Sequence, residues 1–352
     1  MLGRDVLREA ARLEGSNFSL LAGIRGGAFT VAPMALLLAT NDLSLVYATL
    51  GAMLLTTTEG PNSTPLPLRF LLLACLTEAS AFALGTVVAL SGLVAIPLVG
   101  LGVCAGLLAG DSLAVAQVGR VTAIFFAVGV GLPGASAGAA PARFAFALLG
   151  GFLALAGCWL QRSVGRGAGG ASSSYWSTGA TRRGLRQLWP TDLSFRFHVF
   201  RWAVAAGAGS AFGLAAGLLL GLPRDFWIVV TIIVALRPRI GPTVATTLTI
   251  VAGTAVGAML AASITLGTGD LLILGSLLLV FGVLMFASRG VNLGLVQLFF
   301  TPFIIILLNI IYPGDWRLAE IRILDVGIGG AIAILSVCSL EVFERRAHAR
   351  RP

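Results

Sequence analysis

Long apolar stretches separated by short polar breaks run along almost the whole chain. A run of about 20 apolar residues is long enough to cross a bilayer as a helix, and most of these stretches approach that length. The pattern predicts twelve helical spans in two groups of six. They are 20–40, 43–58, 66–91, 93–110, 113–132 and 138–161, followed by 197–221, 225–236, 243–266, 270–287, 291–311 and 322–343.

Three polar segments frame the two groups. Residues 1–19 alternate arginines with acids, which predicts a short amphipathic helix on the cytoplasmic membrane surface. Residues 162–195 are rich in Gly, Ser and Arg and are expected to form a flexible cytoplasmic linker. Residues 344–352 form a basic tail. The chain is therefore expected to contain two membrane units, 20–161 and 196–343.

The two groups repeat short features at a nearly constant offset of about 180 residues. Six spans is an even number, so both halves have the same orientation, as in transporters built from parallel repeats. We expect an all-α membrane protein of about twelve transmembrane helices, arranged as two parallel six-helix repeats. The matching features are Ser112–Gln117 with Asn292–Gln297, Leu132-Pro133-Gly134 with Tyr312-Pro313-Gly314, and Arg143 before Gly150-Gly151 with Arg322 before Gly329-Gly330.

Composition agrees with a membrane protein. Apolar residues make up 57% of the 352 residues and charged residues only 11%, against about 25% charged in soluble domains. The net charge is +9, and the arginines lie between the apolar runs. If both termini are cytoplasmic, 19 arginines face inward and four face outward, namely Arg143, Arg224, Arg317 and Arg322. This bias predicts a bacterial plasma membrane protein with both ends in the cytoplasm.

Several function classes are disfavoured. The chain has no lysine, and hence no phosphate-binding loop lysine. Its four cysteines lie inside apolar runs, and its two histidines are far apart, so no metal-ligand spacing occurs. We expect no cofactor, no metal, no enzymatic activity and no nucleic-acid partner. The expected partners are the lipid bilayer and a small organic anion, and a homo-oligomer is compatible with the sequence.

Two predicted spans are too short to cross a membrane. Span 225–236 would be about 18 Å long, against an apolar core of about 30 Å. Its counterpart 43–58 is also short, and short segments at matching places in two halves indicate a substrate site at the membrane midplane.

These short spans carry the candidate binding residues. Trp227 and Thr231 share a helix face, Arg237 precedes Pro238 where the helix must end or kink, and Tyr47 lies on the other short span. Arginine binds carboxylates through paired hydrogen bonds, so the set predicts a carboxylate site. The alternatives are an interfacial anchor for Trp227, a topology role for Arg237 and a backbone hydrogen bond within its own helix for Thr231.

Other polar residues lie at membrane depth. Glu78, near the middle of its span, is a candidate proton carrier, because a charge there is costly unless it is paired, hydrated or protonated. The alternative is a structural pair with Arg120 or a hydroxyl group. Gln117, Gln297 and Thr301 are expected to line the pathway, or else to form hydrogen bonds between helices.

Glycines recur every fourth residue in the seventh span. Gly209, Gly213 and Gly217 let neighbouring helices approach closely, and they are expected to serve packing. Gly253 and Gly257, four residues apart on a later span, are expected to do the same.

The second half resembles the fusaric acid resistance type of transporters, also called aromatic acid exporters. The motif runs through Trp227, Thr231, Arg237-Pro238, Gly241-Pro242-Thr243 and Gly253-Thr254-Ala255-Val256-Gly257 in the family's order. The resemblance is strongest over 196–343. Unlike many members of that family, this sequence has no arginine between Thr246 and Ala252.

The resemblance implies efflux of aromatic carboxylates. Because no nucleotide-binding motif occurs in the sequence, the proton gradient is expected to drive this efflux. There are two alternatives: an organic-anion channel of the malate type and a non-transporting membrane scaffold. Plant malate channels are distantly similar to this family.

Overall fold

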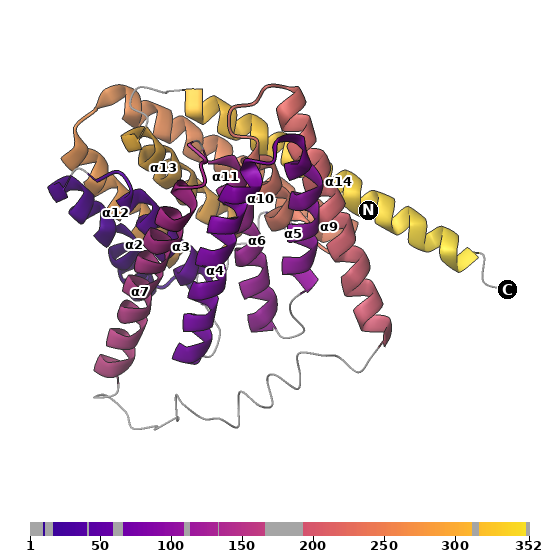
Figure 1. Cartoon of the computed structure of the whole chain (residues 1–352), viewed down its shortest axis with the longest axis horizontal. Helices are drawn as coiled ribbons and strands as arrows, with labels where there is room; N and C mark the ends of the chain where they lie inside the picture. Colours follow the sequence, from indigo (N-terminus) through magenta and orange to yellow (C-terminus); the bar gives the residue numbers. More distant parts are fainter. Residues whose placement is uncertain are drawn as a thin grey trace.

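The computed structural model describes residues 10, 17–40, 42–58, 66–108, 113–132, 134–165, 193–311 and 317–349. Over these residues the chain forms helices joined by turns, with no strand (Figure 1). Each of the twelve predicted spans is a helix. The helices are α2 (Leu20–Thr40), α3 (Leu45–Thr58), α4 (Leu68–Ala89), α5 (Ala95–Leu108), α6 (Leu113–Gly131), α7 (Ala139–Gly165), α9 (Leu193–Leu219), α10 (Phe226–Ala235), α11 (Ile240–Gly267), α12 (Leu271–Ala287), α13 (Leu293–Ile311) and α14 (Arg317–Ala349), with a short 3₁₀ turn at Gly92–Val94.

Within the described part of the chain, seven helices are long and apolar enough to cross a membrane: α2, α4, α7, α9, α11, α13 and α14. Helices α3, α5, α6, α10 and α12 are shorter apolar helices. The chain is therefore a multi-pass helical membrane protein. Length and composition support a crossing for seven of the twelve helices, and they leave the twelve-span arrangement unconfirmed.

The last helix is longer than the sequence predicted. It continues to Ala349 instead of ending at 343, and its C-terminal end projects beyond the other helices (Figure 1). Residues 344–349 contain no glycine or proline, so nothing in this stretch breaks the helix. The charged residues after Phe343 end the apolar run, but the helix continues through them.

The two short helices lie inside the bundle. Nine of the ten residues of α10 and twelve of the fourteen residues of α3 are buried. The longer helices instead expose large apolar side chains on their outer faces, such as Leu73 of α4 and Met259 of α11. Surrounding helices therefore cover α3 and α10, so neither needs to match the thickness of the bilayer.

A non-helical segment that contains Pro238 separates α10 from α11. Leu236 is extended, with φ −64° and ψ 125°, and Pro238 cannot supply the N–H that a continuing helix needs. The buried Thr243 hydroxyl accepts a hydrogen bond from the Arg237 N–H at 3.0 Å and donates to the Arg239 carbonyl at 2.8 Å. The Arg237-to-Thr243 part of the motif therefore fixes where α10 ends.

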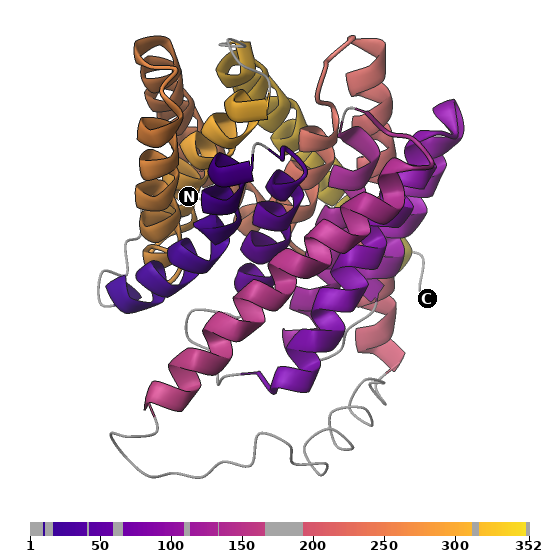
Figure 2. The same ribbon diagram turned by 60° about the vertical axis from the view of Figure 1, so that its left-hand side comes forward.

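The same pairs of helices are in contact in both groups of six. Helix α4 packs against α6 and α7, as α11 packs against α13 and α14, and the pair α3–α7 corresponds to α10–α14. Between the groups, α2 packs against α12 and α5 packs against α9; the labels of Figure 1 and the turned view of Figure 2 show these helices together. The repeated sequence features thus have a counterpart in the packing.

The glycines of the packing prediction lie at helix contacts. A Cβ added at Gly209 would meet Ser336 of α14, and one at Gly213 or Gly217 would meet α10 or Asp225 just before it. At Gly253 and Gly257 it would meet the carbonyl oxygens of Gly294 and Leu298 on α13. Each of these positions therefore has little room for a side chain.

One helix start offers a modest stability test. The Asp270 side chain accepts hydrogen bonds from the N–H groups of Leu272 (2.8 Å) and Ile273 (3.1 Å), and thereby caps α12. Asp270→Ala is expected to lower the free energy of unfolding by about 1 kcal/mol. Thermal unfolding of the full chain in detergent would measure this loss. Asp270→Asn keeps the acceptor and should retain most of the stability; an equal loss in both variants would contradict the capping role.

Candidate functional site

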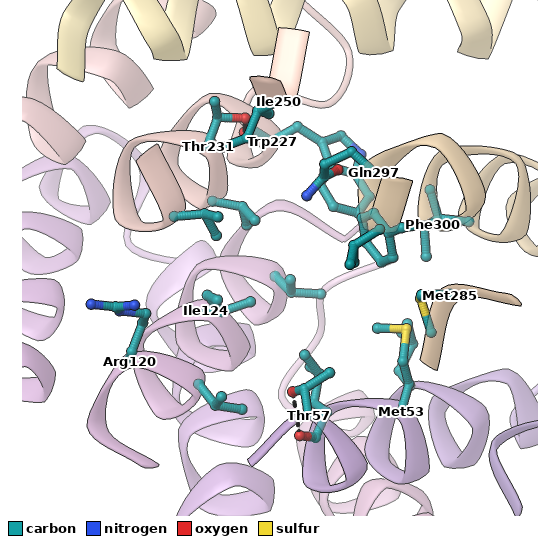
Figure 3. Close-up of a pocket in the computed structure, with 18 of the residues that line it drawn as sticks. Met53, Thr57, Arg120, Ile124, Trp227, Thr231, Ile250, Met285, Gln297 and Phe300 are labelled. Carbon is teal, nitrogen blue, oxygen red and sulfur yellow. Dashed lines mark hydrogen bonds between the residues drawn. The ribbon is translucent and has the colours of Figure 1, made fainter. Parts of the chain in front are cut away.

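A cavity of about 260 Å³ lies between the two groups of helices. Residues of α3 and α6 from the first group and of α10 and α13 from the second form most of its wall. Trp227, Gln297 and Phe300 lie together on one side, with Met53 and Thr57 on the opposite side (Figure 3). Most lining residues are apolar, so a bound molecule would meet an apolar wall with a few polar groups.

The charged groups of the cavity all have one sign. Arg120, Arg237, Arg289 and Arg322 line it, and no aspartate or glutamate occurs among the described lining residues. Charge in an apolar setting inside a membrane is costly unless it is compensated. Such a cavity therefore favours an anion and disfavours a cation.

Three of these arginines gather where α3 and α10 end. Arg289 donates hydrogen bonds to the carbonyl oxygens of Thr56 (2.8 Å) and Thr57, and Gln117 donates to Thr57 at 3.4 Å. These bonds satisfy the last carbonyls of α3 and place positive charge at the negative end of its dipole. Arg120 lies one turn beyond Gln117 and within electrostatic range of Arg237.

The fourth arginine lies at the other end of α10. The Arg322 guanidinium carbon is 4.1 Å from the ring centroid of Trp227 and 5.8 Å from that of Phe300. Cations are attracted to the faces of aromatic rings, and most strongly to tryptophan. Arg322 is only 4% exposed, and its Nε and Nη1 atoms have no hydrogen-bond partner.

Arg143 is the counterpart of Arg322 in the first group. Its guanidinium carbon lies 5.3 Å from the ring centroid of Tyr47, the aromatic residue of the other short helix. It also donates hydrogen bonds to the Thr86 hydroxyl (3.1 Å) and to the carbonyls of Leu132 (3.3 Å) and Gly129 (3.4 Å). Arg143 does not line the cavity. It therefore holds helices together, whereas Arg322 faces the cavity.

Three of the four arginines that were counted on the outer side are not in exposed loops. Arg143, Arg224 and Arg322 are all at least nine-tenths buried. Arg143 and Arg322 lie in the second turns of α7 and α14, which pack against the central short helices. Their burial means that they carry little information about the charge of exposed loops.

Most of the predicted binding residues come together in the cavity. Trp227, Thr231, Arg237, Gln117, Gln297 and Tyr47 all line it. The Thr231 hydroxyl donates to the Trp227 carbonyl of its own helix at 2.8 Å, as the alternative interpretation held. Thr301 is fully buried but does not line the cavity.

Glu78 lies apart from the cavity. It is 2% exposed on α4, and its Oε1 accepts a hydrogen bond from the Thr58 hydroxyl at 2.8 Å. It is absent from the cavity wall, although Thr57, the neighbour of Thr58, belongs to that wall. The structure therefore gives Glu78 the hydroxyl partner that the structural alternative required.

Sequence reasoning missed Arg120, Arg289, Arg322 and Phe300 as lining residues. A signal existed for Arg322: Arg143 and Arg322 match at an offset of 179, and Tyr47 and Trp227 match at 180. The two pairs together would have indicated an arginine beside each aromatic residue. No comparable signal exists for Arg289, whose carbonyl partners are 232 and 233 residues away.

Residues 209–336 match the family model described as "Fusaric acid resistance protein-like". This range includes Trp227, Arg237, Gln297 and Arg322, and so most of the second group's share of the cavity. The family resemblance predicted from the sequence is therefore confirmed for the second half of the chain. No curated protein and no solved structure matches the chain significantly.

Proposed function

We propose that this protein is a secondary membrane transporter that moves small organic acids with an aromatic ring out of the cytoplasm, and that the central cavity is its binding site. One observation carries the proposal: four arginines and no described carboxylate line a cavity that is otherwise mainly apolar. The arginines suit a carboxylate, and the apolar wall suits a ring. The family match of the second half agrees with a transport role.

We also propose that all twelve helices span the membrane as two six-helix repeats, with both termini in the cytoplasm of a bacterial cell. The shared helix pairs of the two groups support the repeat. The burial of α3 and α10 supports short spans that their neighbours shield from lipid. In this orientation, the three-arginine end of the cavity faces the cytoplasm and Arg322 lies toward the outside.

The proton gradient is proposed as the energy source, and the protein is proposed to be a transporter without enzymatic activity. Glu78 is the candidate proton carrier: it accepts a hydrogen bond from the Thr58 hydroxyl, and the neighbouring Thr57 lines the cavity. The absence of a nucleotide-binding motif in the sequence supports this assignment.

Transport can be tested with the full chain in lipid vesicles. The probe is radiolabelled phthalate, an aromatic acid whose ionised form does not leak across the bilayer. We expect an imposed proton gradient to accumulate phthalate against its own gradient. Arg237→Gln is expected to reduce this flux by roughly tenfold, because it removes a cation from the cavity wall.

Protein-free vesicles provide the background rate. A flux that follows voltage alone, without accumulation, would favour the malate-type channel. No flux of phthalate or of any other carboxylate would favour a membrane scaffold and reject transport.

A further inference from the structure

We propose that Arg322 is the carboxylate-binding group of the cavity, and that Trp227 and Phe300 hold the ring of the bound acid beside it. The inference rests on the proposed function and assigns its binding residues. It moves the anchor from Arg237, the candidate named from the sequence, to the opposite end of α10, about 15 Å away at 1.5 Å per residue.

The first argument is the unsatisfied hydrogen-bonding capacity of Arg322. Its Nε and Nη1 atoms have no hydrogen-bond partner although the side chain is 96% buried. A buried charged donor without a partner is strongly unfavourable, and a carboxylate is the partner that a guanidinium binds best. The same side chain lines the cavity, and a turn of the guanidinium toward the cavity would bring these buried donors to a ligand inside.

The second argument is the contrast with Arg143. Both arginines lie over the aromatic residue of a short helix. Both terminal nitrogens of Arg143 donate to a hydroxyl or a carbonyl, and Arg143 does not line the cavity. Arg322 lines the cavity, and its Nη1 makes no hydrogen bond. The same framework therefore has a structural arginine in one half and a ligand-binding arginine in the other.

The third argument is the shape of the surrounding wall. The rings of Trp227 and Phe300 are 6.3 Å apart and nearly perpendicular, at 75°. Gln297 lies beside them, and its Oε1 has no hydrogen-bond partner (Figure 3). The volume of about 260 Å³ is slightly below the ~300–1,000 Å³ of typical ligand pockets. A single-ring carboxylate fits these features better than a larger molecule.

Asp325 is the natural competitor for Arg322. It lies one turn further along α14, within electrostatic range of Arg322 and also of Asp225 and Arg224. Both of its carboxylate oxygens are buried without a hydrogen-bond partner, so Asp325 attracts Arg322 without a hydrogen bond between them. Asp325 does not line the cavity. It therefore attracts the guanidinium away from a ligand without contacting the ligand itself.

The test is equilibrium binding of radiolabelled benzoate to the full chain in lipid nanodiscs, with uncharged benzamide as a competitor. Arg322→Gln is expected to weaken benzoate binding by roughly tenfold or more and to abolish the preference for benzoate over benzamide. Asp325→Asn is expected to tighten benzoate binding several-fold. Arg239→Gln, which removes an exposed arginine outside the cavity, is the matched control and should bind like the wild type.

The outcomes separate this inference from the proposed function. If wild-type vesicles transport phthalate but Arg322→Gln binds benzoate as well as Arg239→Gln does, the Arg322 assignment is wrong and transport stands. If the double variant Arg322→Gln/Asp325→Asn restores wild-type binding, Arg322 is only a partner of Asp325, and the assignment fails again. A wild-type protein that neither binds benzoate nor transports any carboxylate would reject both.

Discussion

Replacing Gly150 with valine is expected to prevent the protein from folding. Gly150 of α7 lies directly against the backbone of α3, where an added Cβ would collide with the carbonyl oxygen of Ala48 and lie 2.8 Å from the amide nitrogen of Ala52. These are backbone atoms of a helix, so they cannot rotate away as a side chain could. The loss should exceed the ~1–3 kcal/mol of ordinary overpacking, because two whole helices must separate.

The yield of monodisperse protein in mild detergent and its thermal unfolding would measure this effect. Gly329→Val tests the matching contact in the second half, where a Cβ would lie 2.7 Å from the Ile228 carbonyl oxygen of α10. Gly327→Ala is the control on the same helix, because a Cβ there meets no atom within 4 Å. It should keep or raise stability by about 0.5–1 kcal/mol. A wild-type yield of Gly150→Val would show that α3 and α7 do not pack this closely.

The helices could be predicted from the sequence because the bilayer leaves the backbone few choices. A chain inside lipid must satisfy its peptide groups internally, so an apolar run of sufficient length becomes a helix. Each predicted span is a helix for this reason, even the short 225–236 that became α10. The end of α14 was missed because hydropathy marks where the apolar run stops, and the helix continues through charged residues beyond Phe343.

The site was only partly predictable, for a different reason. Trp227 was found because it lies on a span too short to cross the membrane. Gln117 and Gln297 were found because they are polar residues at matching positions of two apolar spans. Arg289 reaches the end of α3 from the end of α12, and only the three-dimensional packing brings the two together. Arg322 was placed at the outer end of the last span and not in the site, because hydropathy does not show which face of a helix a residue occupies. Its aromatic partner on α10 keeps it inside the bundle.

Arg143→Gln is expected to destabilise the protein by about 1–3 kcal/mol, the cost of leaving buried hydrogen-bond acceptors without their donor. Arg143 is 1% exposed and joins α7 to α4 through Thr86 and to the end of α6 through the carbonyls of Gly129 and Leu132. A neutral, shorter side chain leaves these acceptors buried without their donor, and that is more costly than the loss of the bonds themselves. Thermal unfolding of the full chain in detergent measures the change.

Arg322→Gln is the matched comparison for Arg143→Gln. It should have a smaller effect on stability and a larger effect on benzoate binding. Arg322 donates no hydrogen bond from Nε or Nη1 to the protein, so its removal strands no acceptor at those atoms. It does leave the buried Asp325 without a facing cation, so the comparison is made in an Asp325→Asn background, where Arg322→Gln should cost less stability than Arg143→Gln. Benzoate binding should respond in the opposite order: Arg322→Gln loses it, and the fraction of Arg143→Gln that folds retains it. Equal losses of stability in the two variants would mean that both arginines are structural, and the functional asymmetry between the two halves would then disappear.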